Sequence, residues 1–196
     1  MPAKPVLSED DKRELKVKLK ELCERRWTVN GYKKTSVKEL CASMGIAIGT
    51  FYALFPTKED LFCETIVEIQ ERLMGKFLAT CQESPNKDGF IAAIKEMLRE
   101  YETKPFLYDV KKPDFQSLVT KLSDEAVEKM KFDNAELLRK AIQTANLSLK
   151  IDEYKAYGVL GALISTIYAK ETLSVTYDYF SVLDFMIDRL IPTIFE

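Results

Sequence analysis

Hydroxyl-bearing and small side chains recur in residues 35–62 at the spacing of capped helices with one exposed face. Ser36 and Glu39 have the spacing of a capping box, in which each side chain accepts a hydrogen bond from the backbone amide of the other residue. Thr50 lies further along, next to Gly49. A threonine hydroxyl on an exposed helix can hydrogen-bond a base edge or a phosphate oxygen, and a neighbouring glycine lets the backbone come close. The chemistry that these residues support is recognition of nucleic acid.

Three successive helices must position these groups. The first is predicted over Ser36–Met44, after which Gly45 can adopt the left-handed conformation that ends a helix. The second follows over about Ala47–Leu54 and ends before Pro56, because proline lacks an amide donor and restricts the residue before it. The third begins after Thr57, a favourable cap. Helix, glycine-containing turn and helix is the helix-turn-helix arrangement, in which the second helix enters the major groove of DNA.

On this interpretation the second helix has a buried side and a side that faces DNA. Phe51, Leu54 and Phe55 are assigned to the core of the small domain. The start of the first helix is expected to donate hydrogen bonds to phosphate through Thr35 and Ser36, as helix N-termini do. The residues assigned to the groove are Ile48, Gly49, Thr50 and Ala53.

The pattern L-x-x-x-x-G-I-x-x-G-T-F-Y-x-x-F-x-x-K-x-x-L, which begins at Leu40, resembles the N-terminal DNA-binding domain of the TetR family of transcriptional regulators. The resemblance covers about the first third of the chain, and the rest matches only in layout. It implies that Tyr52 and Lys58 contact phosphate. Two positions depart from the family, since Ala47 stands where a capping serine is common and Ile48 where a polar base reader is common. The groove face is therefore expected to be unusually apolar.

Apolar residues continue at helical spacing through the rest of the chain, and strand-like alternation is nowhere sustained. The sequence therefore predicts an all-α fold of about nine helices, with a three-helix DNA-binding head and a helical body for ligand binding and dimerisation. The predicted domains are residues 1–62 and 63–196. Outside the helix-turn-helix, helices are expected at about 8–29, 57–81, 90–101, 114–122, 123–149, 152–172 and 177–194, with a short irregular segment at 106–110. The first of these can be capped by Ser8 with Asp11 and is ended by Asn30-Gly31.

Composition narrows the class of protein. The chain has 196 residues, of which 46% are hydrophobic and 31% charged, and its net charge is −2. Residues 1–62 carry 12 Lys and Arg against 9 Asp and Glu, so a mildly basic head precedes an acidic body, as in a DNA-binding protein. No stretch reaches the roughly 18 apolar residues of a membrane span, and no signal sequence is recognised. We therefore expect a cytoplasmic protein with no membrane partner.

Histidine is absent, and this excludes His-based catalysis and the ordinary Cys/His zinc sites. No C-x-x-C pair and no glycine-rich phosphate loop is present either. The four cysteines occupy apolar helix positions and are expected to be small buried hydrophobes: Cys23, Cys41, Cys63 and Cys81. We therefore expect no enzymatic activity, no cofactor and no metal.

Aromatic residues of the body can line an apolar effector cavity with hydroxyl tips. Ordinary core packing is the alternative for each of them. Lysine and arginine are sparse among the inward positions, so an uncharged or cationic apolar ligand is expected. The residues assigned to this pocket are Tyr101, Phe106, Tyr108 and Phe115.

The last two helices are predicted to form a homodimer surface, with a monomeric core as the alternative. Small residues on neighbouring turns of the first helix would let another helix come close, and apolar residues of the second would pack opposite. The family resemblance implies a four-helix arrangement of two subunits here. The residues assigned to this surface are Gly158, Gly161, Ala162, Ser165, Leu183, Met186, Ile187 and Leu190.

These expectations describe a homodimeric, sequence-specific DNA-binding transcriptional regulator. It would be a repressor, released from a palindromic double-stranded DNA operator by a small apolar effector. The alternative is a helical small-molecule- or lipid-binding protein whose head no longer reads DNA. The sequence identifies neither the operator nor the effector.

Overall fold

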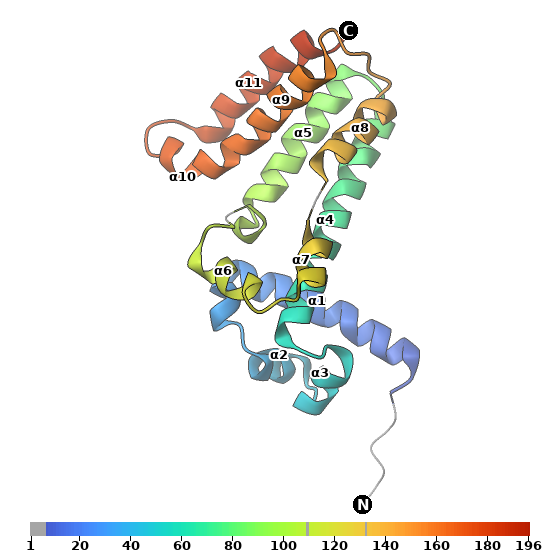
Figure 1. The fold of residues 1–196 in the computed structure, drawn as a ribbon, viewed down its shortest axis with the longest axis vertical. Helices are drawn as coiled ribbons and strands as arrows, with labels where there is room; N and C mark the ends of the chain where they lie inside the picture. Colours follow the sequence, from blue (N-terminus) through green and yellow to red (C-terminus); the bar gives the residue numbers. More distant parts are fainter. Residues whose placement is uncertain (1–6, 109, 132) are drawn as a thin grey trace, which may run out of the picture. The chain divides into compact units, whose positions relative to one another are not determined.

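The computed structural model describes residues 7–108, 110–131 and 133–196, and Figure 1 shows that these ranges are built from helices. Within them, the one β pairing is an isolated antiparallel bridge between Leu149 and Phe195. The predicted all-α fold class is confirmed. The chain divides into two compact units: unit 1 comprises residues 1–69 and 109–131, and unit 2 comprises residues 70–108 and 132–196.

Unit 1 contains the predicted helix-turn-helix, and this prediction is confirmed. Its two helices, α2 and α3, are bent by 104° relative to each other. The first half of α4 belongs to this unit, and the rest of α4 belongs to unit 2. The helices of unit 1 are α1 (Glu9–Lys34), α2 (Val37–Met44), α3 (Ile48–Leu54), the start of α4 (Lys58–Glu83), α6 (Pro113–Val119) and α7 (Asp124–Met130).

The helix starts of unit 1 are fixed by the polar side chains that the sequence indicated. Ser8 forms a capping box at α1, and Ser36 forms one at α2. At α4, Thr57 Oγ1 accepts a hydrogen bond from the amide of Asp60 at 3.0 Å. Loss of such a cap costs about 0.5–2 kcal/mol. These three starts are therefore specified locally, by residues only three positions apart.

α1 is broken at Gly31, where φ is 77° and ψ is 172°. Glycine adopts a positive φ without the steric penalty that a Cβ atom brings. The predicted end of the first helix at Asn30-Gly31 is confirmed as a break, and one further turn, Tyr32–Lys34, follows it.

Aromatic rings form the centre of unit 1. The ring centroids of Trp27 and Phe62 are 4.5 Å apart, and Tyr32 meets Phe62 edge-on at 5.1 Å. Phe51 and Phe55 pack together at 5.8 Å and are fully buried. These rings bury the inner side of α3 and leave its other side open.

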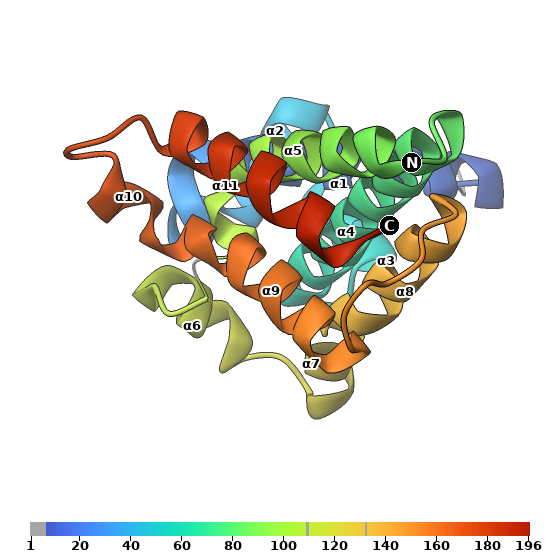
Figure 2. The same cartoon turned by 90° about the horizontal axis from the view of Figure 1, so that it is seen from above.

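Unit 2 is a helical bundle. Figure 2 shows α11 flanked by α5 and α9, and both pairs are in contact. Its core is apolar and includes Phe77, Phe90 and Leu160. Besides the second half of α4, its elements are α5 (Lys87–Glu102), the 3-10 turn η1 (Pro105–Leu107), α8 (Asn134–Thr144), α9 (Glu153–Ser165), the 3-10 turn η2 (Thr166–Ala169), α10 (Lys170–Leu173) and α11 (Tyr179–Ile194).

The prediction of one long helix over residues 123–149 is wrong. Residues in this range form α7 and α8, because Lys131 adopts an extended conformation (φ −67°, ψ 129°). Asp133 then starts α8 by accepting a hydrogen bond from the amide of Glu136 at 3.0 Å. α8 itself ends at Thr144, and Asn146 has a positive φ of 52°.

The helix predicted over residues 152–172 is likewise interrupted. α9 ends at Ser165, and a 3-10 turn separates it from the short α10. The other predicted helices are found within a few residues of their expected ends. All nine predicted helices therefore exist in the described residues, two of them in pieces.

The predicted domain boundary after residue 62 stays a prediction, since the compact units are divided differently. Unit 1 includes residues 109–131, which the sequence assigned to the body. In the described part of the chain, no single helix is long and apolar enough to cross a membrane, and only the bent pair of α2 and α3 reaches that length and composition together.

Candidate nucleic-acid interface and body cavity

The turn between α2 and α3 is closed by backbone hydrogen bonds. Gly45 has a positive φ of 66°, and the next amide, that of Ile46, donates to the carbonyl of Cys41 at 3.1 Å. Ala47 starts α3 without a side-chain cap, as its residue type implies. Its carbonyl accepts from the amide of Thr50 at 2.9 Å. The turn is therefore fixed by the main chain, and the start of α3 carries no capping side chain.

The outer side of α3 combines apolar and hydroxyl groups. Ile48 is 48% exposed and Tyr52 is 51% exposed. Gly49 and Ala53 are also exposed, and Thr50 is half-buried. The inner side consists of buried rings and leucine, so the helix presents one face to its own domain and one outward. Contact of the outer face with DNA stays a prediction.

Thr35 is directed into unit 1. Its side chain is buried, its hydroxyl donates to the carbonyl of Gly31 at 2.8 Å, and its amide donates to the carbonyl of Tyr32 at 3.3 Å. Both donors of Thr35 are therefore used inside unit 1, and its contact with phosphate stays a prediction. Ser36, by contrast, is half-buried and uses its hydroxyl oxygen as the acceptor of the α2 cap, at 3.2 Å from the amide of Glu39.

Lys58 is also directed inward. Its ammonium donates to the carbonyl of Tyr32 at 2.6 Å and lies 3.9 Å from the centre of the Tyr32 ring. Burial lowers the pKa of Lys58, and neighbouring Glu59 opposes this shift. In this arrangement Lys58 links the start of α4 to the end of α1. Contact of Lys58 with phosphate stays a prediction.

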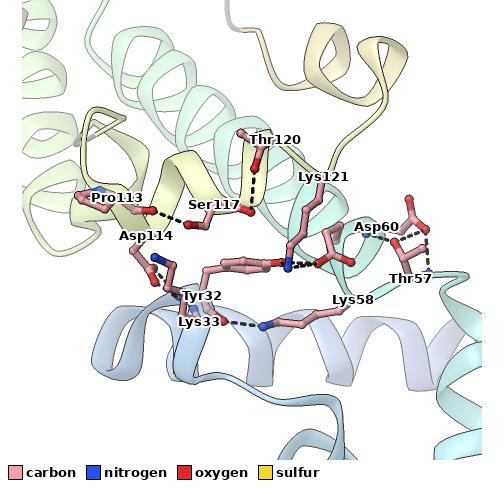
Figure 3. A network of polar contacts seen from close by, with 11 residues as sticks. Tyr32, Lys33, Thr57, Lys58, Asp60, Pro113, Asp114, Ser117, Thr120 and Lys121 are labelled. Carbon is pink, nitrogen blue, oxygen red and sulfur yellow. Dashed lines mark hydrogen bonds and ion pairs between the residues drawn. The ribbon is translucent and has the colours of Figure 1, made fainter.

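Sequence reasoning missed a polar network beside this lysine, shown in Figure 3. Asp114, in the first turn of α6, accepts hydrogen bonds from the amides of Tyr32 at 2.5 Å and Lys33 at 2.9 Å. The Tyr32 hydroxyl donates to Glu59 and accepts from Lys121 at 3.1 Å. Lys121 and Glu59 form an ion pair at 3.7 Å. No local pattern could have revealed these partners, because Asp114 and Tyr32 are separated by 82 positions.

Phe115, which was assigned to the effector pocket, belongs to unit 1. Its ring is stacked against that of Trp27, with 6.5 Å between centroids and 14° between planes. This placement is a correction to the sequence prediction. Phe115 supports the aromatic core of the head and does not line the cavity of unit 2.

A partly open apolar cavity lies inside unit 2. Its only polar lining groups within the described residues are the Gln70 amide and the Tyr101 hydroxyl. Burial raises the pKa of Tyr101 to about 12, with a smaller contribution from Tyr168, so the hydroxyl is protonated at neutral pH. The lining residues are Gln70, Leu73, Met74 and Phe77 of α4, Met97, Leu98 and Tyr101 of α5, Leu137 and Leu138 of α8, and Ile164 of α9.

Of the predicted pocket residues, only Tyr101 lines this cavity. Tyr108 stacks on Tyr101 with 6.3 Å between ring centroids and meets Tyr168 edge-on at 6.2 Å. Phe106 is buried in η1 and is not a lining residue. The sequence could not show that the apolar side of α4 borders unfilled space, and the assignment of the effector site stays a prediction.

The predicted dimer residues fall into two groups. Gly158, Ala162 and Ser165 are exposed on α9, and a Cβ atom added at Gly158 would meet nothing within 4 Å. Gly161, Met186 and Leu190 are partly exposed. Leu183 and Ile187, however, are buried in the core of unit 2, where packing inside the subunit already covers them. On α11 the exposed apolar residues are instead Val182 and Phe185. The dimer surface itself stays a prediction.

The model of the bacterial regulatory proteins of the tetR family matches residues 25–65 of this chain. This range contains α2, α3 and the start of α4. No curated protein matches the sequence.

Solved structures of transcriptional regulators have the same fold. The chain is 16% identical to a putative TetR-family transcriptional regulator from Mesorhizobium loti, with a TM-score of 0.64 over 92% of this chain and 95% of that one. It is 17% identical to the transcriptional regulator FadR from Bacillus subtilis, solved in complex with stearoyl-CoA, with a TM-score of 0.61 over 91% and 98% of the two chains. The fatty acid degradation regulator FadR from Bacillus halodurans gives 17% identity and a TM-score of 0.61 over 90% and 94%.

Proposed function

We propose that this chain is a regulator of the tetR type, a homodimeric repressor that an apolar effector releases from a palindromic operator. The observation that carries the proposal is the division of α3 into a buried aromatic side and an exposed side. A helix that is anchored on one side by its own domain and open on the other is the form in which a helix-turn-helix protein presents its reading helix.

The exposed side of α3 supports base reading by methyl and hydroxyl contacts. Ile48 and Ala53 can contact the methyl group of thymine, and the Thr50 hydroxyl can bond either a base or a phosphate. Gly49 has no Cβ atom, so the α3 backbone can approach the groove closely. The Tyr52 hydroxyl, on a half-exposed ring, is proposed to bind phosphate.

The phosphate contacts of lysine are assigned differently from the sequence prediction. Lys33, Lys34 and Lys38 are exposed around the start of α2, whereas Lys58 is partly buried and gives one of its three ammonium hydrogens to the Tyr32 carbonyl. We therefore assign the salt-dependent part of DNA binding to these three exposed lysines. Each phosphate that is neutralised adds about 0.9 to the slope of log affinity against log salt concentration.

Dimerisation is proposed through the open faces of α9 and α11. The exposed face of α9 carries the small residues Gly158, Ala162 and Ser165, which would let another helix pack close to it. On α11, Phe185 is 62% exposed. Two copies of such a surface can pack as a four-helix interface around a two-fold axis. A two-fold protein requires an operator with two related half-sites, about one helical turn or a multiple of it apart.

The effector is proposed to occupy the cavity of unit 2. The cavity walls are aliphatic and aromatic, with the Tyr101 hydroxyl and the Gln70 amide as the polar groups, and no charged residue lines the described cavity. An uncharged apolar moiety is matched by these walls, since a buried unpaired charge is costly. A long hydrocarbon chain meets this requirement, and stearoyl-CoA, the ligand of the Bacillus subtilis FadR structure, contains one.

The proposal is tested by selecting bound fragments from genomic DNA with the full-length protein. A palindromic or near-palindromic sequence is expected, and Ala53→Glu should abolish its selection because a carboxylate then faces the phosphates. Ala79→Glu, at an exposed alanine of α4 in unit 2, is the control for a carboxylate outside both the reading helix and the proposed dimer surface, and it should leave the selection unchanged. Recovery of fragments without a shared sequence would contradict the proposal and favour a helical ligand-binding protein that does not read DNA.

A further inference from the structure

The break at Gly31 leaves backbone donors at the end of α1 that no α-helical carbonyl can satisfy. Each helix turn supplies acceptors to amides four residues further on, and a non-helical residue interrupts this pattern. The amides of Tyr32 and Lys33 follow the break directly. Both donate to Asp114, an unusual case of a helix turn that is capped by a residue more than 80 positions away.

The two oxygens of the Asp114 carboxylate bind two successive amides of the turn. Oδ2 of Asp114 takes the Tyr32 amide at 2.5 Å, and Oδ1 takes the Lys33 amide at 2.9 Å. A Cβ atom at Gly31 would come within 2.8 Å of Oδ2. Glycine is thus required at position 31 both for its positive φ and for the close approach of this oxygen.

The same turn sets the start of the helix-turn-helix. The Gly31 carbonyl accepts the hydroxyl of Thr35, and the Tyr32 carbonyl accepts the ammonium of Lys58 and the amide of Thr35. Ser36, the cap of α2, follows immediately. A displacement of the Gly31–Thr35 turn would therefore move the start of α2 and the start of α4 together.

A second residue of the 109–131 segment contacts the same tyrosine. Lys121 donates to the Tyr32 hydroxyl at 3.1 Å and pairs with Glu59 at 3.7 Å. Asp114 thus holds the main chain of Tyr32, while Lys121 holds its side chain, as Figure 3 shows. The 109–131 segment is therefore joined to the end of α1 by both a main-chain contact and a side-chain contact.

We propose that Asp114 is a positioning residue for DNA binding, which holds the Gly31–Thr35 turn in the place from which α2 and α3 reach the operator. The inference rests on the proposed function, because it concerns how the reading helix is presented. It means that the DNA-binding head is assembled from two separate stretches of sequence, and that residues 1–62 lack one of its parts. It also gives α6 a direct mechanical connection to the helix-turn-helix.

The test uses the full-length protein and two substitutions that remove the same charge. Asp114→Asn keeps the shape of the side chain but leaves one acceptor oxygen, so one of the two amides loses its partner. Asp124→Asn, at an exposed position of α7 in the same segment, is the matched control. Hydrogen exchange of the Tyr32 and Lys33 amides and the ratio of affinities for the selected operator and a scrambled duplex are measured below the unfolding transition of each protein.

In Asp114→Asn, exchange of at least one of the two amides should accelerate by about tenfold or more, the factor expected for loss of a charge-assisted hydrogen bond. The affinity ratio should fall by a similar factor, whereas both quantities should stay near wild type in Asp124→Asn. A role in stability alone would lower the unfolding midpoint and leave the affinity ratio of the folded protein unchanged.

Two results would overturn the proposal: unchanged exchange at both amides, or faster exchange with an affinity ratio equal to that of Asp124→Asn. Gly31→Ala, which crowds the same carboxylate from the α1 side, provides a second variant and should lower the ratio in the same way. Failure of the wild-type protein to prefer any duplex would contradict the proposed function instead, and the exchange rates would then show separately whether Asp114 holds the turn.

Discussion

Unit 1 and unit 2 differ in the kind of polar contact that joins residues far apart in the sequence. In unit 1, a carboxylate and two ammonium groups bind specific main-chain or hydroxyl atoms of Tyr32 and its neighbours. In unit 2, the long-range polar contacts include partly exposed ion pairs such as Lys95–Asp188, at 2.6 Å, besides hydrogen bonds to main-chain carbonyls near the end of α11, and the interior is apolar around a cavity. Exposed ion pairs contribute little to stability.

The difference indicates how each unit can respond to change. A directional polar contact is lost when its partners move, so unit 1 should keep one geometry for its reading helix. Apolar side chains around unfilled space can repack at small cost, so unit 2 should accept ligands and substitutions of different shape. Matched substitutions in the two units test this contrast.

The largest effect is expected from Gly31→Ala. Alanine would have to adopt a φ near 77° and would place Cβ 2.8 Å from Asp114, so we expect a loss of about 2–3 kcal/mol in the free energy of unfolding. Gly49→Ala is the control, because Gly49 lies in α3 and its added Cβ would meet nothing within 4 Å. That control should leave stability unchanged or raise it by about 0.5–1 kcal/mol in urea unfolding. Equal effects of the two substitutions would contradict the claim that Gly31 is required for the close approach of Asp114.

A pair of enlarging substitutions compares the two cores directly. Leu40→Phe in the fully buried head core should cost about 1–3 kcal/mol, because no space is available for the larger ring. Ile164→Phe points the same kind of ring at the cavity of unit 2 and should change stability by less than about 1 kcal/mol. Urea unfolding of both variants checks this. A larger cost for Ile164→Phe would show that unit 2 is packed as tightly as unit 1.

Lys58 and Lys38 distinguish a lysine that holds the head together from one that binds phosphate. Lys58→Met should lower stability by about 1 kcal/mol through loss of its contacts with Tyr32, and should leave the salt slope of operator binding unchanged. Lys38→Met should leave stability unchanged and reduce the slope by about 0.9 if it neutralises one phosphate. A reduced salt slope in Lys58→Met, with an unchanged slope in Lys38→Met, would instead support the phosphate contact of Lys58 that the family resemblance implied.

The smallest effect concerns the buried thiols. Burial raises the pKa of Cys23 to about 12 and that of Cys81 to about 11. Above the ordinary thiol pKa of 9.0, the unfolded chain releases these protons and the folded chain keeps them, so stability must fall as pH rises. At pH 9.5 each thiol should remove about 0.8 kcal/mol relative to neutral pH. Cys81→Ala should lose its share of this pH dependence, and an unchanged dependence would contradict burial of that thiol.

Features that the sequence predicted correctly depend on residues a few positions apart. The caps at Ser8, Ser36 and Thr57, the left-handed Gly45 and the two sides of α3 are all of this kind. Each follows from the geometry of one helix turn, which is the same in any protein.

Features that the sequence missed depend on distant residues or on the quality of packing. The Asp114–Tyr32 contact joins two segments 82 positions apart, and the cavity exists because side chains from four helices fail to fill the space between them. The break before α8 is different. Asp133 and Glu136 carry a cap at the same spacing as Ser36 and Glu39, but the apolar period on either side favoured one continuous helix.

The most direct test is the affinity of the protein for its selected palindrome, measured by fluorescence anisotropy beside a duplex with one half-site scrambled. We expect the palindrome to be bound at least about 10³-fold more tightly than unrelated DNA, and scrambling one half-site to remove most of this preference. Equal affinity for the palindrome, the half-scrambled duplex and unrelated DNA would contradict the claim that two copies of α3 read an operator.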